Sequence, residues 1–312
     1  MTAIEEIKEL QNSLKKDSSN FQARRRLAVL LLDSGFDEDA LKQFLFLIGI
    51  FPSDASLYYN LGIVYEKLRK LDLAENSYLK AIELSPEETD FYYNLGLVYI
   101  DKFEFDKAIS SFNTVVKTDV DDANSYFNLG LCFTKKGDGK TAIEYYKKAI
   151  ELNRNDVFAH FYLGNHYKEM GNIDLAIAEF EKVIKISPDY SWAYFNLGSI
   201  FFEQGNIEAA MENLKKTIGL NPRDIDAYKI FAKLLIKIEE VDQAQELVET
   251  ALIDNEYEAD LYYILAQIYK MQGMVENYTN FLKKSLQNYE TLTISPKIVK
   301  QELDEYIQKE EI

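Results

Sequence analysis

The chain has 312 residues, of which 47% are hydrophobic and 28% charged, a composition typical of a folded, water-soluble protein. Its net charge of −17 disfavours nonspecific binding to nucleic acid or anionic membranes, because both need a basic surface. One cysteine, Cys132, excludes an internal disulfide and a cysteine-rich metal site. No apolar run has the ~18 residues of a membrane-spanning helix, and "MTAIEEIKEL" is unlike a secretory signal, so we expect a cytoplasmic protein without membrane insertion.

The first predicted element is an amphipathic helix over residues 2–16. A repeat of 34 residues follows from residue 21 and runs through eight consecutive units. One position of every unit holds a residue no larger than alanine, and leucine or phenylalanine precedes it. These small residues are Ala28, Gly62, Gly96, Gly130, Gly164, Gly198, Ala232 and Ala266.

Two further columns repeat with the same period. Alanine stands twelve residues after the small position in seven units, and a large apolar residue stands sixteen residues after it in all eight. Apolar residues recur at steps of three and four, which predicts helices. A break near the middle of each unit, often at glycine, predicts two antiparallel helices per unit. Asp138, Asn172 and Asn206 follow such glycines and are expected to cap the second helix.

This pattern resembles the tetratricopeptide repeat family over residues 21–292. The resemblance is carried by the small/leucine pair, by the alanine column, by prolines at unit ends and by an aromatic three residues after the small position. It implies an all-α, right-handed superhelical solenoid of antiparallel helix pairs. We expect a capping helix or half-repeat over 1–20, eight repeats over 21–292 and a capping helix over 293–312.

In the last segment, Ser295 and Pro296 form a helix-start signal. We expect Ile298, Leu303, Tyr306 and Ile307 to cover the last repeat, and Glu302, Glu305 and Lys309 to face water.

The family resemblance places the first helix of each unit on a concave groove, where this chain has asparagines beside aromatic rings. Amides can hydrogen-bond the main chain of an extended peptide, and aromatic side chains supply burial. The row is similar to the asparagine ladder of O-linked N-acetylglucosamine transferase repeat domains, although Tyr162 interrupts it. The predicted peptide-binding residues are Asn60, Asn94, Asn128, Asn165, Asn196, Tyr59, Tyr93, Phe127, Phe158, Phe161, Tyr162, Trp192, Phe195 and Phe202. The alternative is that the asparagines bridge neighbouring helices.

A second candidate surface contains Leu45, Phe46 and Phe51, which are apolar where the outer face of other units is polar. Either the amino-terminal helix covers them or they form a convex interface, and a homodimer is one form that such an interface takes. The carboxylate clamp known in the family is not matched, because Ile264 stands where the clamp pattern needs asparagine.

The sequence predicts no catalytic residue, cofactor or metal site. His160 and His166 occupy packing positions six residues apart and do not share one helix face. We therefore expect a non-enzymatic scaffold that binds a peptide segment of another protein in its groove. The alternative is a structural subunit of an assembly or homo-oligomer that uses its convex face or its ends.

Overall fold

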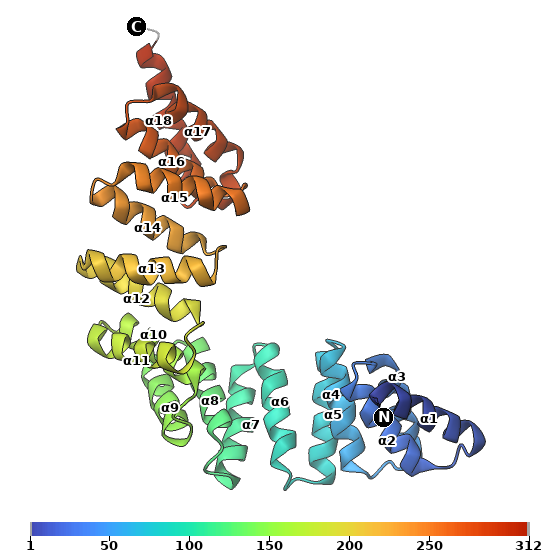
Figure 1. Cartoon of the computed structure of the whole chain (residues 1–312). Helices are drawn as coiled ribbons and strands as arrows, with labels where there is room; N and C mark the ends of the chain where they lie inside the picture. Colours follow the sequence, from blue (N-terminus) through green and yellow to red (C-terminus); the bar gives the residue numbers. More distant parts are fainter. Residues whose placement is uncertain (1, 311–312) are drawn as a thin grey trace. The chain divides into compact units, whose positions relative to one another are not determined.

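The computed structural model describes residues 2–310. Over that range it contains eighteen α-helices, one 3₁₀ turn and no strand, so the prediction of an all-α fold is confirmed (Figure 1). Helix α1 (Ala3–Lys16) precedes eight helix pairs. The first helix of each pair, here helix A, is α2 (Phe21–Asp33), α4 (Ala55–Lys67), α6 (Thr89–Asp101), α8 (Ala123–Lys135), α10 (Val157–Glu169), α12 (Ser191–Gln204), α14 (Ile225–Lys237) or α16 (Ala259–Met271).

The second helix of each pair, here helix B, begins sixteen residues after the start of helix A. The turn η1 (Tyr289–Thr291) and helix α18 (Pro296–Glu310) follow the last pair. The B helices are α3 (Asp37–Ile50), α5 (Leu71–Leu84), α7 (Phe105–Thr118), α9 (Gly139–Leu152), α11 (Ile173–Ile186), α13 (Ile207–Leu220), α15 (Val241–Asp254) and α17 (Val275–Gln287).

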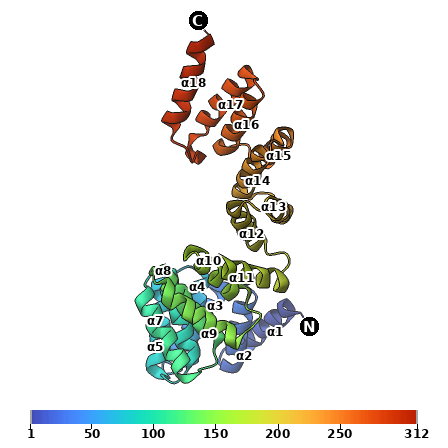
Figure 2. The ribbon, with the colours of Figure 1, turned by 90° about the vertical axis from the view of Figure 1, so that its left-hand side faces the viewer.

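The helices form two compact units, an amino-terminal unit that ends at Ala159 and a carboxyl-terminal unit that begins at His160. In the amino-terminal unit, helices α1 to α9 pack against their neighbours in chain order. In the carboxyl-terminal unit, helices α12 to α18 do the same, as two views of the ribbon show (Figures 1 and 2). Each unit has its own buried apolar core.

The small position of the repeat exists because a large side chain of helix B lies directly against it. A Cβ atom at Gly62 would lie 2.5 Å from Tyr78 Cε1, and one at Gly96 would lie 2.7 Å from Phe112 Cζ. Both rings are fully buried. The sequence columns at the small position and sixteen residues later are therefore two sides of one contact within each helix pair.

The turn between helices A and B requires a left-handed residue. Five units use glycine there, with φ between +74° and +78°, which is the conformation that glycine adopts without steric cost. The other three units hold Arg69, Phe103 and Glu239 at the same position, with φ of +57°, +60° and +65°. Of these, Phe103 is 78% exposed.

The predicted caps after these turns are confirmed at two of three positions. Asp138 accepts a hydrogen bond from the Thr141 N–H and Asn206 from the Ala209 N–H, whereas the Asn172 side chain makes no capping bond.

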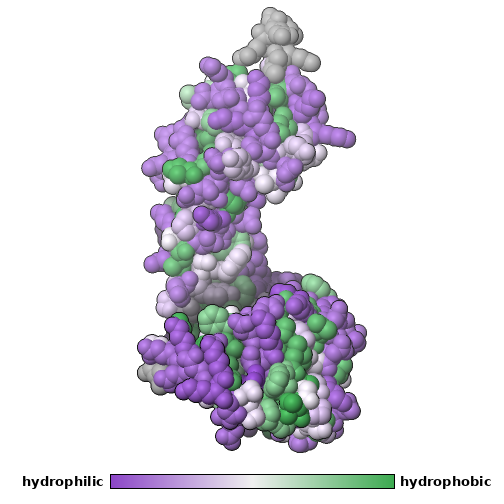
Figure 3. All heavy atoms as spheres, turned by 90° about the vertical axis from the view of Figure 1, so that its right-hand side faces the viewer, coloured by the Kyte–Doolittle hydropathy of each residue, from purple (hydrophilic) through white to green (hydrophobic). Residues whose placement is uncertain are grey.

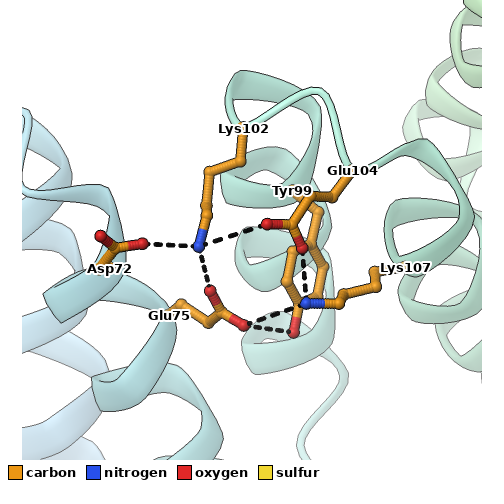
Figure 4. Close-up of polar contacts among 6 residues, drawn as sticks. All are labelled: Asp72, Glu75, Tyr99, Lys102, Glu104 and Lys107. Carbon is orange, nitrogen blue, oxygen red and sulfur yellow. Dashed lines mark hydrogen bonds and ion pairs between the residues drawn. The ribbon is translucent and has the colours of Figure 1, made fainter.

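A polar cluster joins the second and third helix pairs (Figure 4). Lys102, whose side chain is 17% exposed, lies 2.7 Å from the Asp72 carboxylate and 2.5 Å from that of Glu75. Tyr99 donates a hydrogen bond of 3.1 Å to Glu75, and Lys107 pairs with Glu104 at 2.6 Å. Hydrogen bonds from Lys102 to these carboxylates raise its pKa, so the ammonium stays charged. The cluster fixes α6 and α7 against α5.

The carboxyl-terminal helix α18 covers the last helix pair, and the prediction is confirmed for Leu303 and Tyr306 but is wrong for Ile298 and Glu302. Val299 and Leu303 are buried, whereas Ile298 is 56% exposed. Glu302 does not face water as expected, because it accepts hydrogen bonds from Gln267 and Lys270 of α16. Val299 is buried where Ile298 was expected to be, and the Glu302 carboxylate bonds to α16 instead of facing water. Ile307 and Lys309 have side chains outside the described set.

Candidate protein-binding surfaces

The face of the A helices that carries the predicted peptide-binding residues is here called the inner wall. In the amino-terminal unit it contains two equivalent hydrogen bonds, here called links, between consecutive A helices. The Asn94 amide donates a hydrogen bond of 2.8 Å to the Tyr59 hydroxyl, and Asn128 donates one of 3.2 Å to the Tyr93 hydroxyl. Donor and acceptor are 35 residues apart in both cases. Burial raises the pKa of Tyr59 and of Tyr93, so both hydroxyls stay protonated. The asparagine thus connects one repeat to the preceding one.

The link forms only where a tyrosine stands 35 residues before the asparagine. Phe161 precedes Asn196 by 35 residues and has no hydroxyl. Asn196 instead donates to the Trp192 carbonyl at 2.9 Å and accepts from Lys168 at 3.2 Å. At the pair between these and the two links above, Phe127 stands in place of the tyrosine and Tyr162 in place of the asparagine.

The remaining predicted asparagines differ again. Asn60 donates to the carbonyl of Ser56 within its own helix at 2.7 Å. Asn165 is half-buried, and its side chain makes no hydrogen bond to another described residue. The structure therefore does not present the five amides as one equivalent row.

A hollow of about 460 Å³ lies on the inner wall of the amino-terminal unit. It brings together four of the predicted site residues, from α6, α8 and the start of α10. Phe127 and Phe158 lie with ring centroids 6.4 Å apart, and Phe158 is 55% exposed. Tyr93 and Asn128 line the same hollow, as do Leu97, Asn124, Asn153, Asn155, Asp156 and Val157.

The carboxyl-terminal unit carries the other predicted aromatic residues. Trp192 is 52% exposed and meets Phe195 edge to face at 6.3 Å. Phe161 packs against Phe180 and Tyr190 with centroids 5.9 and 5.2 Å away. Tyr162 and Phe202 are half-buried. Trp192 is therefore the most accessible ring of this group.

A larger depression, of about 760 Å³, was not predicted from the sequence. It lies in the amino-terminal unit, where the turns after the first two B helices meet the starts of α4 and α6. Its walls include Phe51, Asp54, Glu88 and Phe91. Asp54 is paired with Arg25 at 2.6 Å, so the weakly acidic character of the rim comes from Glu88. The repeat pattern indicates where the turns lie but not the space that neighbouring turns enclose, so this depression could not be predicted from it.

The outer face of α3 is exposed, as is part of α5. Leu45 is 48%, Phe46 44%, Ile50 46% and Leu79 43% exposed. Helix α1 packs on α2 and does not cover them, so the expectation that it would is wrong. Phe51 differs, because it is half-buried against Phe21 with ring centroids 5.3 Å apart. On the amino-terminal unit, hydrophobic areas interrupt the hydrophilic surface (Figure 3).

The two histidines and the cysteine lie in the protein interior. His160 is buried, and its Nδ1 lies 2.6 Å from the Glu179 carboxylate. Cys132 is fully buried, and burial raises its thiol pKa to about 12. The described residues contain no group of three or more histidine, cysteine or acidic side chains arranged to hold a metal ion. Among them, too, no helix is both long and apolar enough to cross a lipid bilayer.

Models of the tetratricopeptide repeat match residues 55–88, 89–120, 123–156, 145–178 and 201–268, and a model described as "TPR repeat" matches 164–205. With the helix pairs described above, these matches show that the chain belongs to the tetratricopeptide repeat family. A search of curated protein sequences found no match.

Solved structures of the same fold include YrrB, described as a TPR protein with an unusual peptide-binding site. It is 29% identical over 59% of this chain and 95% of its own, with a TM-score of 0.50. MamA is 28% identical over 53% of this chain and 97% of its own, also with a TM-score of 0.50. A tetratricopeptide repeat protein from Parabacteroides merdae, at 19% identity, covers 81% of this chain and 98% of its own with a TM-score of 0.57.

Proposed function

We propose that this protein is a non-enzymatic cytoplasmic scaffold whose inner wall binds a peptide segment of a partner protein. The observation that carries the proposal is the hollow between α6, α8 and the start of α10, where Phe127 and Phe158 lie beside Asn124 and Asn128. Exposed aromatic rings beside polar groups are typical of the residues that dominate protein interfaces. The similarity to YrrB, whose description names a peptide-binding site, supports the same reading.

The asparagines have a secondary role in this proposal. The Nδ2 groups of Asn94 and Asn128 already bond to tyrosine hydroxyls, but their Oδ1 atoms accept no hydrogen bond from a described residue. Each Oδ1 can accept one bond from a peptide N–H, and such a bond contributes only ~0.5–1.5 kcal/mol. Burial of the aromatic anchors therefore supplies most of the binding free energy.

Removing one exposed ring, Trp192, and one half-buried ring, Phe161, tests the proposal for the carboxyl-terminal unit. The double variant Phe161→Ala, Trp192→Ala is compared with the wild type in affinity purification from cells, with circular dichroism as a check of folding. Loss of a protein that co-purifies with the wild type, at unchanged helicity, supports the groove. Unchanged retention of every co-purifying protein counts against it for this unit.

A second function is favoured by the exposed side chains of α3. Leu45, Phe46 and Ile50 lie on the outer face and are each exposed by more than two fifths. Such a surface fits a structural subunit or homo-oligomer that associates through its convex side. Light scattering of wild type and Phe46→Asp decides: a dimer mass that falls to the monomer supports this function, and a monomer mass for both excludes the homo-oligomer.

A further inference from the structure

In the carboxyl-terminal unit, a cavity of about 220 Å³ lies between α14, α16 and the segment that leads into α18. Ile236, Ile264 and Ile294 form an apolar lining with Tyr263. The third wall is specific to the last repeat, because residues 292–295 cross the start of α16. The Thr293 N–H and hydroxyl both donate to Asp260 Oδ1, at 2.8 and 3.0 Å.

Several charged groups around this cavity are paired within the protein. Lys229 pairs with Asp226 and with Asp260, both at 2.9 Å, and Asp260 is 5% exposed. Glu302 accepts from Gln267 and Lys270. The acidic groups Asp226, Glu258 and Asp260 lie at the starts of α14 and α16.

Lys233 lies at the cavity wall with its side chain exposed. Its ammonium makes no ion pair or hydrogen bond with a side chain or carbonyl in the described range. Lys237 follows one helical turn later and lies over the Phe202 ring at 5.9 Å. The seventh repeat has three basic and nine acidic residues, and all three basic residues are Lys229, Lys233 and Lys237 on α14. An unpaired ammonium beside an apolar cavity favours a ligand that combines an apolar group with a negative charge.

We propose that this cavity binds a partner segment in which a large aliphatic side chain stands next to an aspartate or glutamate. The aliphatic side chain fills the space between Ile236, Ile264 and Ile294, and the carboxylate pairs with Lys233 Nζ. This inference rests on the proposed function, since it assigns the kind of segment that one part of the inner wall accepts. The proposed contact involves no aromatic anchor of the partner-binding surfaces described above. Its test can therefore fail while those surfaces still bind a partner.

Methyl NMR tests the proposal, because three isoleucines line the cavity and others lie elsewhere. The protein labelled at isoleucine methyl groups is titrated with acetyl-Gly-Leu-Glu-Gly-amide, whose only charge is the glutamate. We expect the methyl signals of Ile236, Ile264 and Ile294 to shift with a saturable dependence. We also expect acetyl-Gly-Leu-Gln-Gly-amide to bind about 1.4-fold to fivefold more weakly, the range for one exposed ion pair.

Two variants make the test specific. Lys233→Gln should remove the preference for glutamate over glutamine, whereas Lys216→Gln, at an exposed lysine of α13, should leave it unchanged. Unchanged signals, shifts that do not follow these isoleucines, or a glutamate preference that survives Lys233→Gln would overturn the proposal. Acetyl-Gly-Leu-Gly with a free carboxyl terminus would also overturn it by binding more strongly than acetyl-Gly-Leu-Glu-Gly-amide, because the charge would then belong to a chain end. Stronger binding of decanoate than of that peptide would identify a small amphiphile as the ligand instead.

Discussion

The A helices of the two units share one sequence pattern but differ in what holds their inner wall together. In the amino-terminal unit, Tyr59–Asn94 and Tyr93–Asn128 are polar links between consecutive repeats. In the carboxyl-terminal unit, phenylalanine stands where the tyrosine would be, and Asn196 bonds to Trp192 and Lys168 instead. The role of an asparagine is therefore set by the residue 35 positions earlier.

The difference extends to charge. The seventh repeat has Lys233 at a position where the second, third and fourth repeats have Ile63, Leu97 and Leu131. In the amino-terminal unit, neutral amides connect the repeats, and we expect rings and amide oxygens to contact a partner. In the carboxyl-terminal unit, the unpaired Lys233 ammonium is expected to favour a negative charge. The two proposed binding surfaces therefore differ in their chemistry.

The largest effect is expected where the glycine column meets a fixed ring. Gly62→Ala places a Cβ atom 2.5 Å from Tyr78, whose hydroxyl is bonded to Glu66, so the ring cannot easily move. We expect a loss of about 1–3 kcal/mol in the free energy of unfolding. Gly49→Ala is the matched control, because nothing lies within 4 Å of its Cβ and alanine favours the helix. Urea unfolding should show opposite signs for the two variants, and equal effects would contradict the packing argument.

The tyrosine–asparagine link should be measurable as a coupling free energy. A double-mutant cycle of Tyr59→Phe and Asn94→Ala should give about 0.5–1.5 kcal/mol, the usual value of one hydrogen bond. The control cycle combines Asn60→Ala with Tyr59→Phe, since Asn60 bonds within its own helix. Urea unfolding of the four proteins in each cycle supplies the values. A coupling near zero for Tyr59 and Asn94 would mean that the link does not stabilise the contact between the repeats.

The smallest effects concern two carboxyl groups whose pKa values move in opposite directions. Burial raises the pKa of Glu66 in the amino-terminal unit, so its ionised form costs stability at neutral pH and protonation removes that cost as the pH falls. Burial also opposes ionisation of Glu302, but hydrogen bonds from Lys270 and Gln267 outweigh it and lower its pKa. Its contribution is present above the unfolded-state pKa and is lost as the pH falls through the folded-state pKa.

The variants should therefore differ in sign. At pH 7, Glu66→Gln should raise the free energy of unfolding and Glu302→Gln should lower it, each by about 1 kcal/mol or less. Both differences from the wild type should shrink as the pH falls from 7 to 3. Urea titrations at four pH values measure them, and two differences of the same sign at pH 7 would show that one assignment is wrong.

Most of the fold could be predicted because packing repeats every 34 residues. The contact of Gly62 with Tyr78 recurs at Gly96 and Phe112, so both columns appear in the sequence. Local turn chemistry was also readable, as Asp138 and Asn206 show. The contact of Glu302 with Gln267 and Lys270 was not predicted, because a helical pattern does not show which side chain a carboxylate meets on another helix.

Less of the candidate site could be predicted. The sequence places Asn94 and Phe127 on the same inner wall, but not the partner that each side chain chooses. The Asn94 amide donates to the Tyr59 hydroxyl at 2.8 Å, and a repeat pattern does not give the distance between two side chains. The cavity beside Lys233 needs residues 292–295, which lie outside the periodic region. Non-periodic segments and individual hydrogen bonds therefore limit what sequence columns can tell.

The most direct measurement compares two double variants of the amino-terminal inner wall in partner retention and in urea unfolding. Phe127→Ala, Phe158→Ala should lose a partner that the wild type retains, while Asn94→Ala, Asn128→Ala should lower the free energy of unfolding and weaken retention much less. If removing the amides abolished retention at unchanged stability, and removing the rings had no effect on it, the asparagines rather than the rings would bind the partner and this account would be contradicted.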